Sequence, residues 1–130
     1  MDSFGRTDFH YLLVDRPESE HSEKIASLVS KGADINCQDK EGWSPLHFAA
    51  QESSVAAIRT LLECGAKVDL KDSNGNTALF RAVFNSKGAG EIISLLLAAG
   101  SDPDQDNEHG FSPRKLADTI GNYDVAQFFN

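Results

Sequence analysis

A short stretch of the 130-residue sequence carries four acidic side chains at alternate positions, namely Asp102, Asp104, Asp106 and Glu108. Carboxylates spaced in this way converge on the ion in helix–loop–helix calcium sites. The stretch departs from such a site at the sixth position, where Asn107 replaces the glycine of the sharp turn, and at the twelfth, where Pro113 replaces a bidentate glutamate. We therefore predict no metal site here. We interpret the stretch as an acidic surface segment that could meet Lys or Arg side chains of a partner.

Histidines are the other side chains with possible acid–base or metal chemistry, and the sequence has four, namely His10, His21, His47 and His109. His10 and His47 occupy equivalent places in the repeated pattern described below, and no further ligands stand at metal-binding spacing from them. We therefore expect both to be buried, hydrogen-bonded structural residues. His21 and His109 are predicted to lie in turns, where they could titrate near neutral pH.

The sequence contains no local signature of catalysis or of nucleotide binding. The glycine-rich phosphate-binding and dinucleotide-binding motifs are absent, and so is the Gly-x-Ser-x-Gly motif of serine hydrolases. Cys37 and Cys64 belong to no Cys-x-x-Cys pair, and we interpret them as two reduced thiols. These observations predict a protein that is not an enzyme and that uses no cofactor and no metal.

The charge balance limits the kind of partner. Asp and Glu number 20 against 12 Lys and Arg, which gives a net charge of −8. Binding to nucleic acid needs clustered basic residues, so we expect no nucleic-acid partner. The charge favours a basic protein partner or serves solubility alone. No apolar run approaches the length of a membrane span and the N-terminus lacks signal-peptide features, so we expect no membrane partner and a cytoplasmic location.

The elements that position these residues follow from a motif that occurs four times: an Asp or Asn, a Gly three positions later, and a Thr or Ser two positions after that. The copies begin at Asp2, Asp39, Asp72 and Asn107. Gly42 and Gly75 of the two middle copies are 33 residues apart, and so are Gly32 and Gly65 of a second motif in the same phase. A repeat of this length indicates small helical units that bury their apolar faces against one another.

The second unit shows the expected order of elements most clearly. Ser44 is a suitable N-cap, and Pro45 suits the first turn of a helix. After a break, residues 55–62 place apolar side chains at helical spacing, and Gly65 ends this second helix. Alternating apolar and polar residues then lead into the turn at residues 72–75, which predicts a hairpin. Each unit is thus a helix, a turn, a second helix and a hairpin loop.

These residues resemble the ankyrin repeat family over nearly the whole chain. Residues 44–49 read Ser-Pro-Leu-His-Phe-Ala, one conservative change from the family motif Thr-Pro-Leu-His-x-Ala. The resemblance implies an all-α repeat solenoid of four helix–turn–helix units with short β-hairpin loops, forming a single domain over residues 1–130. It implies divergent caps as the first and last units, and structural roles for His10 and His47 in orienting the hairpin loops. The approximate repeats are 2–38, 39–71, 72–105 and 106–130.

Two units are longer than the 33-residue period. Intervals of 37 and 35 residues separate the first motif glycine from the second and the third from the fourth, and the excess lies between the two helices, near residues 15–20 and 85–90. Longer turns of this kind either contribute to a binding face or are tolerated surface loops. The apolar stripes predict a core that contains Leu28, Ile58, Leu61, Leu62, Ile92, Leu95, Leu96 and Val125.

Ankyrin proteins usually bind partners through a concave surface formed by the hairpin tips and the exposed side of the first helices. The resemblance implies that the partner-binding residues are Phe4, Arg6, Lys40, Glu41, Trp43, Gln51, Glu52, Ser73, Asn74, Asn76, Phe84, Glu108, His109 and Phe111. Trp43 is the first candidate, because the register points it outward and Trp is frequent among interface hot spots. Phe4 and Phe111 could extend it into an aromatic row. The alternative is that each aromatic ring folds back onto its own hairpin.

Two functional hypotheses follow. In the first, the chain is a monomeric module that binds and inhibits or neutralises a basic partner such as a toxin, a nuclease or another enzyme, and it resembles bacterial immunity proteins. We expect the repeats to leave no room for an effector domain. In the second, the chain is a scaffold or regulatory adaptor without an inhibitory role. Asn36 resembles the hairpin Asn that asparaginyl hydroxylation modifies in eukaryotic ankyrin proteins, and a hydrogen bond of its side chain across the hairpin is the competing interpretation.

Overall fold

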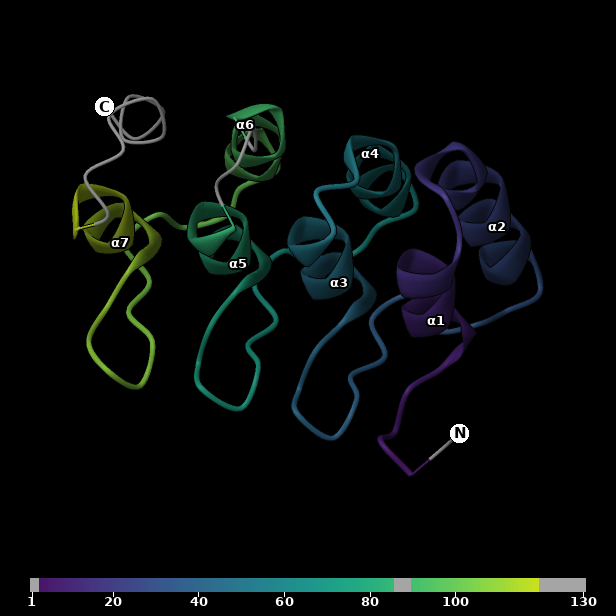
Figure 1. Cartoon of the computed structure of the whole chain (residues 1–130), viewed down its shortest axis with the longest axis horizontal. Coiled ribbons are helices and arrows are strands. Elements are labelled where there is room, and N and C mark those ends of the chain that lie inside the picture. The colour runs from purple at the N-terminus through teal and green to yellow at the C-terminus, as the bar shows by residue number, and fades with distance from the viewer. Residues whose placement is uncertain (1–2, 86–89, 120–130) are drawn as a thin grey trace.

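The computed structural model of the chain describes residues 3–85 and 90–119. Over these residues seven helices stack in two rows, and loops project from one of the rows (Figure 1). The first row comprises α1 (Asp8–Asp15), α3 (Pro45–Gln51), α5 (Ala78–Phe84) and α7 (Pro113–Thr119), and the second comprises α2 (Glu18–Ser30), α4 (Val55–Glu63) and α6 (Gly90–Ala98). The all-α repeat architecture expected from the sequence is confirmed.

The first-row helices begin where the repeated Thr or Ser stands. The hydroxyl groups of Ser44, Thr77 and Ser112 accept a hydrogen bond from the backbone N–H three residues later, at 3.3, 3.4 and 3.1 Å. Such a bond satisfies one of the N–H groups that the first turn of a helix leaves without a partner. The prediction that Ser44 is an N-cap is therefore confirmed. Gly65 follows the C-terminal end of the second-row helix α4 and has a φ of 91°, as expected for a residue that ends a helix.

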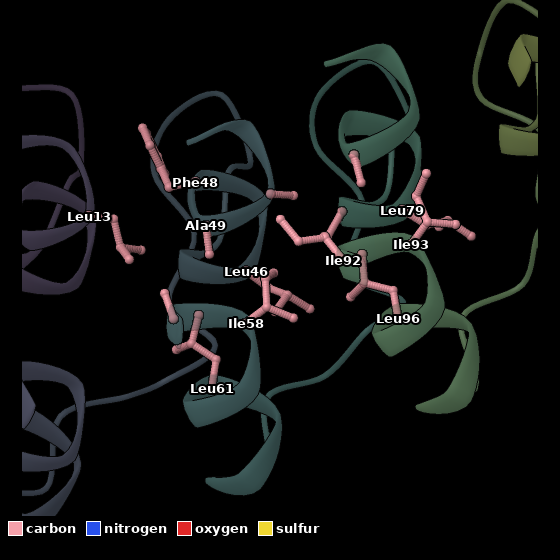
Figure 2. Close-up of a cluster of buried hydrophobic side chains, with 14 of the residues drawn as sticks. Leu13, Leu46, Phe48, Ala49, Ile58, Leu61, Leu79, Ile92, Ile93 and Leu96 are labelled. Carbon is pink, nitrogen blue, oxygen red and sulfur yellow. The ribbon is translucent and has the colours of Figure 1, made fainter. Parts of the chain in front are cut away.

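The hydrophobic core lies between the two rows and between successive helix pairs (Figure 2). Of the residues predicted to be core, Ile58, Leu61, Ile92 and Leu96 are buried. Leu28, Leu62 and Leu95 are partly buried and pack against the same cluster, whereas Val125 lies outside the described residues. Because each helix pair presents apolar side chains on two sides, its burial depends on the neighbouring pairs.

The sequence suggested that the extra residues of the first unit lengthen the turn between its helices, but the structure shows that they do not. Only Arg16 and Pro17 separate α1 from α2, and α2 has 13 residues whereas α4 and α6 have 9 each. The four additional residues therefore form about one more helical turn. His21 lies in that turn and is buried, so its predicted place in a turn between elements is wrong. The excess predicted near residues 85–90 falls largely outside the described residues.

Candidate functional site

A tip loop is the turn that precedes a first-row helix, and the tip loops before α3, α5 and α7 are each folded by one acidic or amide side chain. In the loop of residues 39–43, Oδ1 of Asp39 accepts hydrogen bonds from the backbone N–H groups of Glu41 and Trp43, at 2.9 and 2.8 Å. Asp72 and Asn107 make the same pair of bonds in the loops of residues 72–76 and 107–111. The hairpins expected from the sequence are thus held by side-chain-capped turns, and no strand forms within residues 3–85 and 90–119.

Neighbouring tip loops are joined through their backbones. The N–H of Lys40 donates to the carbonyl of Phe4 at 2.8 Å, that of Ser73 to the carbonyl of Glu41 at 2.8 Å, and that of Glu108 to the carbonyl of Asn74 at 3.0 Å. These loops approach so closely that a Cβ added at Gly42 would lie 2.8 Å from the Cα of Asp72. The loops therefore form one continuous row beside the first helices (Figure 1).

His10 and His47 orient the next loop along the chain. Nε2 of His47 donates to the carbonyl oxygen of Asn76 at 2.8 Å, and its Nδ1 accepts from the N–H and the hydroxyl of Ser44. His10 bonds in the same way to Thr7 and to the carbonyl of Trp43. Burial lowers the pKa of His47, because an imidazolium ion would lose its hydration there. Both rings have both nitrogens engaged, as the structural interpretation expected.

Most of the predicted partner-binding residues are exposed on the tip loops and on the ends of the first helices. Arg6, Trp43 and Gln51 are only partly exposed. The exposed residues are Phe4, Lys40, Glu41, Glu52, Ser73, Asn74, Phe84, Glu108, His109 and Phe111.

The structure brings the predicted residues together in two grooves. The first groove lies between α1, α3 and α5, and its lining includes Arg6, Glu41, Trp43, Gln51 and Glu52. The second lies between α5 and α7, and its lining includes Asn74, Asn76, Phe84, His109 and Phe111. The predicted residues that line neither of these grooves are Phe4, Lys40, Ser73 and Glu108.

Two of the predicted contact residues are less exposed than the sequence suggested. Trp43 does not point freely outward, because its ring packs against Phe48 with the centroids 4.9 Å apart and the Arg81 guanidinium lies 4.6 Å from its ring centroid. Asn76 is buried at 6% exposure, and its Oδ1 accepts a hydrogen bond from Asn107 at 2.8 Å. The Trp43 ring is therefore partly covered by Phe48 of its own repeat and by Arg81 of the next, and the Asn76 side chain is bound by Asn107 of the next repeat.

Sequence reasoning missed Phe48 and Arg81, which connect these residues across repeats. Arg6 lies over the rings of Phe4 and Phe48, at 5.1 and 5.3 Å from their centroids. Arg81 in turn lies between Trp43 and the ring of Phe84, which is 5.8 Å away. Guanidinium groups over aromatic faces are held by cation–π attraction. The signal in the sequence is that Phe48 and Arg81 share one repeat position, the fourth residue after the N-caps Ser44 and Thr77, which is the variable position of the family motif.

The acidic segment of residues 102–108, which leads into the last tip loop, is partly neutralised by its own chain. Arg114 donates to Asp104 at 2.8 Å, and Lys115 to Asp106 at 3.2 Å. The hydrogen bond from Arg114 lowers the pKa of Asp104 below its usual value. This segment therefore offers a partner fewer unpaired carboxylates than its sequence suggested. Within residues 3–85 and 90–119, no group of three or more His, Cys, Asp or Glu side chains is placed to hold a metal ion.

Asn36, Cys37 and Cys64 were also singled out in the sequence. Oδ1 of Asn36 accepts a hydrogen bond from the backbone N–H of Lys67 at 2.9 Å. The side chain is therefore hydrogen-bonded, but to the next repeat rather than across its own hairpin. Cys37 and Cys64 are free thiols. Burial raises the pKa of Cys37, and its Sγ lies 3.2 Å from the hydroxyl of Thr7.

A stack of helix pairs with capped loops aligned along one side defines a helical repeat protein, a class that presents an extended binding surface. No helix within residues 3–85 and 90–119 is long and apolar enough to cross a membrane. The profile of the family described as ankyrin repeats (3 copies) matches residues 14–128. The chain therefore belongs to the ankyrin repeat family, whose repeats are protein–protein interaction modules.

The chain is also similar to segments of much larger proteins. It is 32% identical over 114 residues to the human transient receptor potential cation channel subfamily A member 1, covering 87% of the chain and 10% of that protein. It is 38% identical over 94 residues to the human SH3 and multiple ankyrin repeat domains protein 1, covering 71% and 4%. It is 32% identical over 94 residues to the E3 ubiquitin-protein ligase KEG of Arabidopsis thaliana, covering 72% and 6%. The chain thus spans a tenth or less of these relatives.

Proposed function

We propose that the chain binds one partner protein across its tip loops and first helices, and inhibits or neutralises that partner by covering its surface. The observation that carries the proposal is the row of exposed side chains that backbone bonds between successive loops hold in register. Such a row offers a continuous, preorganised surface, so little conformational entropy is lost when a partner binds. Occlusion of the partner needs no chemistry from the chain itself.

The charges of this surface favour a basic partner. Among the described residues, Glu41, Glu52 and Glu108 are exposed and belong to none of the ion pairs, and of the basic predicted contacts only Lys40 is in the same situation. Arg6 lies 3.6 Å from Asp39 and Arg81 lies 3.6 Å from Asp72, so their charges are largely balanced within the chain. A basic enzyme such as a nuclease would complement the remaining acidic groups.

The adaptor role is the second candidate, and the names of the relatives favour it. One of the relatives is named for SH3 and multiple ankyrin repeat domains, and the chain matches only a small part of each relative. An adaptor would bind its partner at the same surface but would leave the partner's activity intact. The two roles therefore differ in the consequence of binding rather than in its geometry.

The test is a binding and activity experiment with the partner that co-purifies with the chain. Glu41→Lys and Glu52→Lys are each expected to weaken a 1:1 complex about tenfold, because each reverses an exposed charge on the proposed surface. Glu63→Lys, an exposed glutamate at the end of the second-row helix α4, is the matched control and should bind like the wild type. Isothermal titration calorimetry measures the affinities.

Wild-type affinity in both surface variants would reject the proposed surface. The partner's own activity then separates the two roles. Loss of activity on addition of one equivalent of the chain supports inhibition, whereas full activity in a saturated complex supports the adaptor.

A further inference from the structure

The contact between α5 and α7 is built differently from the two contacts before it. Between α1 and α3, and between α3 and α5, a histidine bonds to the next loop and an arginine stacks with an aromatic ring across the repeats. In the third contact, Phe80 occupies the position of His10 and His47, so no imidazole is available there. Asn76 and Leu116 stand at the positions that the arginine–aromatic pairs occupy elsewhere. The arginine–aromatic pairs line the first groove, whereas Asn76 and Leu116 line the second groove at this third contact.

The lining of this groove is mainly apolar. Phe80, Phe84, Phe111 and Leu116 contribute to its walls. Phe84 is 62% exposed and Phe111 is 42% exposed, although both are large aromatic side chains. The ring of Phe84 lies on the Arg81 guanidinium on one side, and its remaining surface is open to solvent. Large exposed apolar surface next to a concave apolar lining is characteristic of a site that another molecule covers.

We propose that this groove receives an aromatic or branched aliphatic side chain of a basic protein partner, and that Lys or Arg residues flank that side chain. The inference rests on the proposed function, because it specifies the partner for the same surface. Charge complementarity determines the flanking residues: Arg81 in the groove is balanced by Asp72 at 3.6 Å, and the exposed Glu108 stands between Asn107 and His109, which both line the groove. An acidic flank on the partner would be repelled by this carboxylate.

The inference changes the expected anchor of the complex. Trp43 is already packed within the stack, whereas Phe84 and Phe111 retain surface that a partner side chain can bury. Burial of an aromatic side chain in such a groove changes affinity by about tenfold or more. The affinity is therefore expected to depend on the third contact of the stack more than on the first two.

The experiment uses three blocked seven-residue peptides as probes of the groove in the full chain. The first has a central Phe between two Lys residues on each side, the second has Ser at the centre, and the third has Glu in place of every Lys. Titration of the isotope-labelled chain at low salt, followed by NMR, should give saturable shifts around Phe84, Phe111 and Leu116 with the first peptide. The other two peptides should bind at least about tenfold more weakly.

Variants of the chain identify the groove. Phe84→Ala and Phe111→Ala are each expected to weaken the first peptide about tenfold, since each removes one apolar wall. The matched control is Phe4→Ala, which removes a ring that is 58% exposed at the first tip loop and should leave the affinity unchanged. Both test residues are exposed, and circular dichroism verifies that each variant remains folded.

The inference is overturned if millimolar peptide gives no saturable shifts, or if the shifts centre on the first two contacts. It is also overturned if the glutamate-flanked peptide binds equally well, or if both phenylalanine variants bind the first peptide with wild-type affinity. Concentration-dependent shifts at Phe84 and Phe111 without peptide would also overturn it, because a second copy of the chain would then cover the groove. A partner complex that tolerates both phenylalanine variants but is weakened by Glu41→Lys rejects the groove and retains the proposed function. A complex that tolerates all of these variants rejects both.

Discussion

The indole of Trp43 shows why a residue's type and register do not determine its role. The tip-loop register suggested an exposed Trp, yet Phe48 of the same repeat and Arg81 of the next one cover its ring. The exposure of the Trp43 ring depends on which side chain of the following repeat lies against it, and that side chain is distant in the sequence. Phe84 remains exposed for the related reason that no such partner faces its outer surface among the described residues.

His47 gives a pH prediction at the same scale. Burial lowers its pKa in the folded state, so below about pH 6.5 the unfolded chain binds a proton that the folded ring does not. Its contribution to stability is therefore full above about pH 6.5 and declines as the pH falls toward the folded-state pKa, by at most about 1.4 kcal/mol per pH unit. Urea unfolding at pH 7.5 and 5.5 should show a smaller difference in His47→Gln than in the wild type.

The control for this prediction is His109→Gln, which changes an exposed histidine of the last tip loop. Its difference between the two pH values should match that of the wild type. The same reduction in both variants would show that the effect does not arise from the buried ring.

At the scale of elements, the added turn of α2 has a clear structural use. Oε2 of Glu18 accepts a hydrogen bond from the N–H of Ala56 at 3.1 Å, in the first turn of α4. Nδ1 of His21 lies 2.7 Å from the hydroxyl of Ser54, which is the N-cap of the same helix, and its Nε2 donates to the carbonyl of Arg16. A carboxylate at a helix N-terminus satisfies unpaired N–H groups and interacts favourably with the helix dipole. The added turn of α2 therefore connects the first helix pair to the second through these hydrogen bonds.

We predict that Glu18→Ala lowers the free energy of unfolding by about 0.5–1 kcal/mol, because α4 loses a capping carboxylate. Glu23→Ala is the matched control: it changes an exposed glutamate of the same helix and should alter stability by less than about 0.5 kcal/mol. The urea midpoint at a constant m-value measures both. Equal midpoints for the two variants would contradict the capping role.

The sequence predicted the start of α3 and the end of α4, because the N-cap hydroxyl of Ser44 and Gly65 act locally. It did not predict the length of α2, since Pro17 and the polar residues after it are compatible with either a loop or a helix start. Contacts with Ser54 and Ala56, more than 30 residues further on, decide between the two. The candidate surface was predicted for the same local reason, through its exposed tips. The grooves were missed because they depend on side chains of two repeats at once.

At the scale of the whole molecule, the net charge of −8 has a kinetic consequence. A basic partner would be attracted over several ångströms before contact, and salt screens that attraction. We predict that raising NaCl from about 25 to 250 mM slows association with the partner about tenfold, with little change in the dissociation rate. Stopped-flow fluorescence measures both rates. An association rate that is insensitive to salt would argue against a basic partner, and an increase would indicate an acidic one.

The lateral hydrogen bonds between tip loops join main-chain atoms only, from Lys40 to Phe4, from Ser73 to Glu41 and from Glu108 to Asn74. Any residue except proline at the donor positions can make these hydrogen bonds. The spacing of the tip loops therefore does not depend on which side chains the loops carry. Mutation can therefore exchange the tip side chains one at a time while the scaffold keeps its shape. A chain of this kind can acquire a new partner gradually, and the same property makes its tip residues a natural target for directed evolution.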